Sequence, residues 1–276
     1  MIGLIVWTTP ENKKGMKVQM CGILHMRFAA VEIPRGTKTP EAVLRRRVRT
    51  AAKRLQKAGV IQTVLPEEFP YVQQLEKQGL RPVSTLGLRR QLAADWVHAV
   101  MAERQLPPGS TRLAVTAGQM TGELVRTVTE LSLRNRYVLL DVPYGGEELC
   151  RQLRREYGVS LVLGPDRDQV EEAEVLVLFD ERQDLKQENA VVLPLYKETE
   201  VPLPPLVLPP ALEEQLPEGV NRAQLLAALQ EAGALRPGQI TLGRDAGDAK
   251  SAGKMGGSPT GKGGILKRKG SRPPPK

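Results

Sequence analysis

Length, composition and charge already limit the kinds of protein that this chain can be. It has 276 residues, of which 41% are hydrophobic, enough to build the core of one large domain or two small ones. The formal charge of +9 is unevenly distributed, because residues 241–276 hold nine basic and two acidic side chains, a net charge of +7. The remaining residues carry only +2, so the net charge does not mark the globular part as a nucleic-acid-binding domain.

The two cysteines and the N-terminal residues give an expectation for the compartment. Cys21 and Cys150 lie far apart in apolar surroundings, without a C-x-x-C motif, which fits a reduced cytoplasmic setting. The opening MIGLIVW is apolar for seven residues with no basic residue before it, so it predicts a β-strand and not a signal peptide. No run approaches the roughly 20 apolar residues that cross a bilayer. We therefore expect a soluble cytoplasmic protein that makes no membrane contact.

Residues 1–110 are predicted to form an N-terminal β/α unit. It opens with two β-rich stretches, 1–7 and 16–33, which are joined by a polar turn and which we expect to be antiparallel strands. A helix is predicted over 41–59, because apolar residues recur there at helical spacing and Gly59 ends the pattern. Further strands are predicted at 60–65 and 80–84, and further helices at 66–79 and 85–105.

Residues 111–197 are predicted to form a second unit in which strands and helices alternate. The predicted strands are 112–116, 137–141, 159–163, 173–180 and 190–196, and the predicted helices are 122–134 and 146–158. Strands that are apolar on both faces and separated by helices are typical of a parallel sheet. The sequence therefore predicts an α/β fold with a mostly parallel sheet and helices on both of its faces.

The last two segments differ from the rest in composition. Residues 198–242 are predicted to hold a proline-rich stretch, extended along the surface without joining the sheet, and a short helix at 221–233. Residues 243–276 are rich in Gly, Lys, Ser and Pro, so we expect a disordered basic tail. The stretch GGSPTGKG in this tail has the G-x-x-x-x-G-K spacing, but it lacks the Ser or Thr, the strand and the helix of a phosphate-binding loop.

The stretch LAVTAGQMTGELV, residues 113–125, runs from a strand through a glycine-bearing turn into a helix. Thr116, Gly118 and Thr121 stand in the register of the dinucleotide fingerprint G-x-G-x-x-G, with Gly118 as its central glycine. Asp141 ends the next predicted strand, 23 residues beyond Gly118, where an acidic residue can hold ribose hydroxyls. This context indicates a possible phosphate-binding turn.

On these residues, the segment 111–180 resembles a Rossmann-type dinucleotide-binding half, over about a quarter of the chain. The resemblance implies a Rossmann-like unit over 111–197 that binds a nucleotide or another small ligand. The cofactor-binding candidates are Thr116, Gly118, Thr121, Gly122 and Asp141. The alternative is a purely structural turn, because threonines replace two of the three glycines. The cofactor is not identified, and NAD, NADP, ATP and S-adenosylmethionine are the ligands to test.

Other candidate residues have structural interpretations. Asp180 ends a strand as Asp141 does and could hold a ribose or a metal, but a solvated strand end or a helix cap is the commoner use. His25 in an early strand and His98 in a helix are expected to be structural, since neither belongs to a metal-ligand motif. No catalytic constellation is recognisable, so the sequence does not indicate whether the protein is an enzyme.

The predicted helix 41–59 carries seven basic residues and one acidic residue. Its basic face and the tail could contact nucleic acid or an acidic protein, which makes a non-catalytic interaction protein the alternative function. The candidate contact residues are Arg46, Arg47, Lys53, Lys267, Arg268 and Lys269. Such binding would be electrostatic and independent of base sequence, because few aromatic residues are available for stacking. A solvated helix face is the structural alternative.

Overall fold

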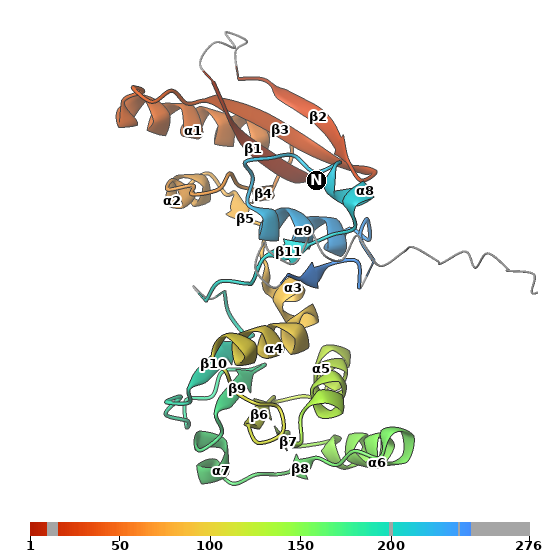
Figure 1. Ribbon diagram of the computed structural model, residues 1–276. Coiled ribbons are helices and arrows are strands. Elements are labelled where there is room, and N and C mark those ends of the chain that lie inside the picture. The colour runs from red at the N-terminus through yellow and green to blue at the C-terminus, as the bar shows by residue number, and fades with distance from the viewer. Residues whose placement is uncertain (10–15, 199–200, 237, 244–276) are drawn as a thin grey trace, which may run out of the picture.

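The computed structural model describes residues 1–9, 16–198, 201–236 and 238–243. It contains two five-stranded sheets, at the top and bottom of Figure 1, and a short two-stranded sheet. Parallel pairing predominates in both large sheets, which confirms the predicted α/β fold. Residues 244–276, almost all of the predicted disordered tail, lie outside the described residues.

The first sheet has the strand order β2-β3-β1-β4-β5. Its strands are β1 (Ile2–Thr8), β2 (Val18–Ile23), β3 (Met26–Pro34), β4 (Gln62–Val64) and β5 (Arg81–Pro82). The predicted antiparallel arrangement is confirmed for β2 and β3, but β1 pairs with β3 in parallel, so the prediction is wrong for β1. Leu4 and Ile5 on opposite faces of β1 are both buried, as is typical of a parallel strand in a sheet that is covered on both faces.

The predicted strand 16–33 is interrupted by a tight turn between β2 and β3. Leu24 and His25 both have positive φ angles, 46° and 68°, which is the backbone conformation of a two-residue hairpin turn. The prediction that His25 lies in a strand is therefore wrong, and its side chain is exposed in the turn.

Helices cover both faces of the first sheet. On one face, α1 (Glu41–Lys57) and α2 (Val72–Glu76) pack against a buried cluster that includes Ile5. The helix predicted over 66–79 is shortened to α2, because Pro70 disfavours a helical conformation at the residue before it. On the other face, Leu4 belongs to a cluster with α3 (Leu86–Gln91) and α9 (Arg222–Glu231).

The proline-rich segment returns the chain to the first sheet. It forms β11 (Leu206–Val207) and α8 (Pro210–Glu213), and β11 pairs with β12 (Thr241–Leu242). The segment joins neither five-stranded sheet, but the expected surface path is wrong at Leu206 and Leu208, whose side chains are buried beside α9. Large apolar side chains between the prolines explain this burial.

The second sheet is entirely parallel, with the strand order β10-β9-β6-β7-β8. Its strands are β6 (Arg112–Thr116), β7 (Tyr137–Asp141), β8 (Val162–Leu163), β9 (Val175–Leu178) and β10 (Val191–Pro194). Since β7 and β8 lie on one side of β6, and β9 and β10 on the other, the order along the sheet reverses between β6 and β9. This is the Rossmann order, which confirms the predicted Rossmann-like architecture.

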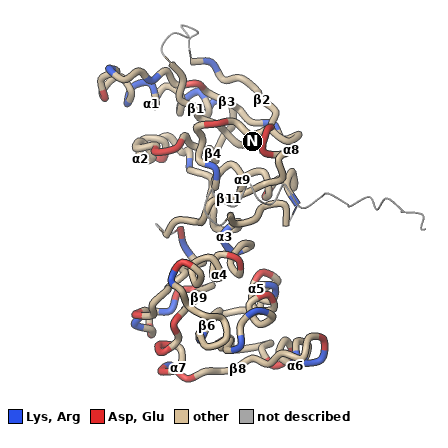
Figure 2. Tube along the Cα trace, viewed as in Figure 1, with Lys and Arg blue, Asp and Glu red and all other residues tan. Residues whose placement is uncertain are grey.

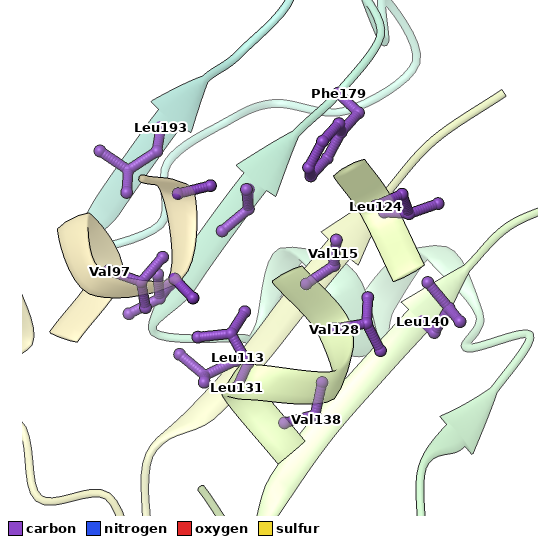
Figure 3. Packing of buried hydrophobic residues seen from close by; sticks show 14 of the residues in the cluster. Val97, Leu113, Val115, Leu124, Val128, Leu131, Val138, Leu140, Phe179 and Leu193 are labelled. Carbon is purple, nitrogen blue, oxygen red and sulfur yellow. The ribbon is translucent and has the colours of Figure 1, made fainter. Parts of the chain in front are cut away.

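Successive side chains of these strands serve different cores. Val115 belongs to the core under α4 (Ala93–Glu103), α5 (Gly122–Arg134) and α6 (Gly146–Tyr157). Figure 3 shows Val115 in this core with Val97 of α4 and Leu124 and Val128 of α5. Ala114 faces the opposite side, where α7 (Arg167–Glu171) and Leu185 complete a smaller core. The prediction of helices on both faces is confirmed, although the second face is covered mainly by a short helix and a loop.

The junction between the sheets lies at Leu92, where the predicted helix 85–105 divides into α3 and α4. Arg90 on α3 donates hydrogen bonds to the carbonyl oxygens of Leu195 at 2.7 Å and Phe179 at 3.3 Å. Because these carbonyls follow β10 and β9, Arg90 ties α3 to the carboxyl ends of the second sheet.

Candidate functional site

The strand reversal between β6 and β9 places a candidate site at their carboxyl ends. In open α/β sheets, the connections that leave neighbouring strands in opposite directions border a crevice where ligands bind. The turn with Gly118 follows β6, and Asp180 follows β9 in the loop beside it. Sequence and topology therefore agree on the position of the candidate site.

Asp180 closes the glycine turn from the neighbouring strand. Its Oδ2 accepts a hydrogen bond from the backbone N–H of Gly118 at 2.7 Å. A Cβ on Gly118 would lie 3.3 Å from the same oxygen, so the absence of a side chain permits this close approach. The carboxylate occupies the position at this amide that a ligand phosphate would take. Asp180 is thus a partner of the turn, a role that its place at a strand end did not indicate.

Asp141 lies at the end of β7, as the sequence predicts, and is held by a residue from the β9–β10 loop. Arg182 forms ion pairs with Asp141 through Nη1 and with Asp184 through Nε at 2.8 Å. The hydrogen bond from Arg182 lowers the pKa of Asp184 to about 2, and the same bond raises the pKa of the guanidinium. The Asp141 side chain is 27% exposed and that of Arg182 is 31% exposed, so both can be reached from solvent.

The two threonines of the turn have different environments. Thr116 is fully buried, and its hydroxyl has no hydrogen-bond partner among the described residues. Thr121 is the N-cap of α5, and its hydroxyl accepts a hydrogen bond from Leu124 N at 3.2 Å. Gly122 begins the helix and is exposed. The structure therefore brings Gly118, Thr121 and Gly122 to the surface of the turn and leaves Thr116 below it.

A cavity of about 590 Å³ lies at the carboxyl ends of β7 and β8, where Leu140 and Val142, the sequence neighbours of Asp141, belong to its lining. Tyr144, Gly145 and Gly146 from the β7–α6 turn line it, and the Tyr144 side chain is 84% exposed. Gly145 is the N-cap of α6 with a φ of +85°, and Met120 from the glycine turn packs against it. Sequence reasoning missed this second glycine turn, although YGG directly after a predicted strand was a signal for it.

A second cleft, of about 990 Å³, runs along β5 to Glu198 and is remote from the glycine turn. Glu198 accepts hydrogen bonds from Ser84 Oγ at 2.8 Å and from both the N–H and Oγ1 of Thr85 at 2.7 Å. Burial raises the pKa of Glu198, but these hydrogen bonds outweigh it, so the net shift is downward. Each of these bonds joins Glu198, which follows β10, to Ser84 or Thr85 at the start of α3. We therefore interpret Glu198 and its partners as part of the junction between the two sheets.

The basic residues that are candidates for contact with nucleic acid or an acidic protein differ in their exposure. Arg46 and Lys53 are exposed on α1, whereas Arg47 is half-buried and donates a hydrogen bond to the Pro34 carbonyl oxygen. The Arg47 side chain thus reaches back to the end of β3, so this candidate contact residue is already engaged within the fold. The tail candidates Lys267, Arg268 and Lys269, like the GGSPTGKG stretch, lie outside the described residues.

The histidines and the described acidic residues were also candidates for a metal or catalytic site. His98 on α4 forms a 2.9 Å hydrogen bond through Nε2 with Asn135 Nδ2, in agreement with a structural role. Burial, followed by the nearby Arg134, lowers the pKa of His98. Within the described ranges, no group of three His, Cys, Asp or Glu side chains has an arrangement that could hold a metal ion. None of the helices in the same ranges is long and apolar enough to cross a membrane.

Comparisons with known proteins give only weak similarities. No protein-family model matches the sequence, and no curated protein matches it. A shikimate dehydrogenase in complex with NADP⁺ is 11% identical, with 65% of this chain and 66% of that chain covered and a TM-score of 0.24. L-tryptophan dehydrogenase from Nostoc punctiforme is 12% identical, with 54% and 44% covered and a TM-score of 0.24.

A third solved structure, D-mandelate dehydrogenase from Rhodotorula graminis, is 8% identical, with 66% of each chain covered and a TM-score of 0.27. This chain thus spans 44% to 66% of the length of the three proteins. Similarities of this size assign no function. The Rossmann-like architecture rests on the strand order of the second sheet.

Proposed function

We propose that the protein binds a small ribose-containing ligand at the carboxyl ends of β6, β7 and β9. The observation that carries the proposal is the position of Asp141, which ends the strand next to the strand reversal and is accessible to solvent. The ion pair with Arg182 engages Oδ2 of Asp141. Oδ1 can therefore accept a hydrogen bond from a ribose hydroxyl while the ion pair persists.

The electrostatics of the turn support a nucleoside without a phosphate at Gly118. A phosphate there would have to displace Asp180 from the amide or lie beside its negative charge. Two unit charges 4 Å apart repel by about 4 kcal/mol at the effective dielectric constant near a protein surface. A hydrogen bond to a charged group contributes only about 1.5–3 kcal/mol, so one amide does not offset this repulsion.

The cavity beside the β7–α6 turn supports the same ligand class. Its volume of about 590 Å³ lies within the range of ligand-binding cavities, about 300–1,000 Å³. Its lining includes Leu140 and Val142, on either side of Asp141 in the sequence, and Tyr144, so a base attached to a ribose at Asp141 could extend into it. Tyr144 offers an aromatic face on which a base can stack.

Calorimetric titration of the full chain with adenosine, S-adenosylmethionine, NAD and ATP tests the proposal. We expect adenosine and S-adenosylmethionine to bind more tightly than NAD and ATP. The Asp141→Ala variant should bind adenosine about 10- to 150-fold more weakly, which corresponds to the loss of about 1.5–3 kcal/mol. Asp168→Ala, which removes an exposed carboxylate on α7, is the matched control and should leave the affinity unchanged.

Two results would contradict different parts of this proposal. If none of the four compounds binds at millimolar concentration, the turn is structural and the ribose site does not exist. If NAD or ATP binds more tightly than adenosine, Asp180 does not keep phosphate away. The Asp180→Asn variant tests the role of the Asp180 charge directly. If this charge keeps phosphate away, its removal should strengthen the binding of NAD relative to adenosine.

A further inference from the structure

A groove between α1 and α2 is lined entirely by side chains that donate hydrogen bonds. Its volume is about 380 Å³, and it lies on the first sheet, away from the proposed ribose site. The lining residues are Arg45, Arg46, Arg49, Gln74, Lys77 and Gln78. Four of them are cationic, two are amides and none is acidic. Figure 2 shows basic positions along α1, which lies near α2.

The packing of the two helices produces this groove. The apolar stripe of α1, which includes Leu44, Val48 and Leu55, is buried against the first sheet, so the arginines between these positions point outward. Leu75 anchors α2 in the same core and leaves its polar neighbours beside α1. The groove therefore combines residues that are about 30 positions apart in the sequence.

The charges in the groove are mostly uncompensated within the described part of the chain. Arg45 forms an ion pair with Glu41, whereas no acidic partner is found there for Arg46, Arg49 or Lys77. Like charges three or four residues apart on a helix destabilise it by about 0.2–0.5 kcal/mol a pair. Such repulsion is relieved when an anion binds, so the cluster is suited to hold one.

We propose that this groove binds the phosphate backbone of duplex nucleic acid. Arginine forks and amide N–H groups match phosphate oxygens in geometry as well as charge. The basic face continues beyond the groove to Lys53 and Lys57, and the helix from Arg46 to Lys57 spans about 16 Å. A basic face of this length is longer than a single phosphate group, so it fits a polymer that carries regularly spaced phosphates.

The composition of the groove favours contact with the phosphate backbone of the nucleic acid and not recognition of its bases. None of its lining residues is aromatic, so it offers no surface on which unpaired bases could stack. Binding should therefore be independent of base sequence and strongly dependent on salt. The inference is separate from the proposed ribose site, because the two share no residue.

The test compares two variants of the full chain that have the same net charge. The groove variant is Arg46→Ala, Arg49→Ala and Lys77→Ala. The control variant removes three exposed arginines of the second unit, outside the cavity beside the β7–α6 turn: Arg136→Ala, Arg154→Ala and Arg155→Ala. Each variant lowers the formal charge from +9 to +6, so a general charge effect, including that of the basic C-terminal residues, is the same in both.

Fluorescence anisotropy with a labelled 20-base-pair duplex gives the affinity at several salt concentrations. We expect the groove variant to bind on the order of tenfold more weakly than the control and its salt slope to fall by up to about 2.7, or 0.9 for each lost phosphate contact. Circular dichroism melting of both variants checks that they fold. Equal affinities of two folded variants would overturn the proposal.

Competition experiments identify the anion. Unlabelled duplex of unrelated sequence should displace the labelled duplex, whereas inorganic pyrophosphate and polyglutamate at the same charge concentration should displace much less. Equal displacement by pyrophosphate would indicate a small-anion site, and equal displacement by polyglutamate would indicate an acidic protein partner. Either result would overturn the assignment to nucleic acid.

Discussion

At the scale of single residues, the charged side chains after β9 determine the state of the candidate site. Asp180 accepts the hydrogen bond of Gly118, and Arg182 holds Asp141, so two residues from one loop engage two residues from two other strands. A ribose can still reach Asp141, but a phosphate at Gly118 would compete with a fixed carboxylate. These contacts are the reason that we propose a nucleoside-type ligand and not a dinucleotide.

The first prediction concerns Asp184, whose pKa is lowered to about 2 by its hydrogen bond with Arg182. A lowered pKa in the folded state contributes stability above the unfolded value near 4, and this contribution is lost as the pH falls toward 2. Asp184→Asn should therefore be less stable than the wild type at pH 5, by less than about 1 kcal/mol because solvent screens this exposed pair.

Urea denaturation at pH 5, 4, 3 and 2 measures this difference. The gap between Asp184→Asn and the wild type should narrow as the pH decreases, because protonation removes the same charge that the substitution removes. A gap that stays constant over this range would show that the Arg182 ion pair does not stabilise the fold.

At the scale of elements, α9 is the helix whose place in the fold is most informative. It follows the second sheet in the sequence, but Leu225, Leu226 and Leu229 are buried in the core of the first sheet. Figure 1 shows α9 beside that sheet. Leu65 N also donates a 2.9 Å hydrogen bond to the Gln224 side chain, and Asn221 N donates to the Leu65 carbonyl oxygen at 2.7 Å. The first core is therefore complete only when the chain has returned from the second sheet.

The second prediction tests this dependence with Leu226→Ala. The side chain is fully buried, so its truncation should lower the free energy of unfolding by about 2–5 kcal/mol, through lost burial and the cavity that remains. Glu231→Ala, at an exposed position near the end of the same helix, should change it by less than about 0.5 kcal/mol. A loss below about 1 kcal/mol for Leu226→Ala in urea denaturation would show that α9 is not needed for the first core.

At the scale of the whole molecule, the described part of the chain connects the two sheets twice. The first connection is α3 and α4, and the second leads from β10 to β11 and begins at Leu195, whose carbonyl oxygen accepts a hydrogen bond from Arg90. Gly243 is the last residue that the structure describes, and its backbone N–H donates a hydrogen bond to the Pro205 carbonyl oxygen at 2.7 Å. Of the predicted tail, Gly243 is therefore tied to the fold by a backbone hydrogen bond.

The third prediction compares two truncations. Removing residues 244–276 should leave the melting temperature nearly unchanged, because this segment has almost no large apolar residues to bury. Removing residues 241–276 should lower it by several degrees, since β12 then no longer pairs with β11 and the Gly243 hydrogen bond is lost. Differential scanning calorimetry measures both effects. A large decrease with the shorter truncation would mean that the removed segment packs onto the core.

The sequence by itself determined most elements of this protein and the class of its fold. Apolar residues at helical spacing predicted α1, and apolar runs between helices predicted the parallel sheet with β6, β7 and β9. Glycine after β6 and the acid at the end of β7 also located Gly118 and Asp141 correctly in the fold. These features are local, because side-chain periodicity and turn composition act within a few residues.

Only the tertiary structure decided which elements meet and what the candidate residues contact. No local pattern indicated that β1 would pair in parallel with β3, that α9 would return to the first sheet, or that Asp180 would bind the amide of Gly118. Each of these contacts joins parts of the chain that are distant in sequence. Their partners are selected by complementary burial, charge and shape across the whole core, which a local pattern of residues does not contain.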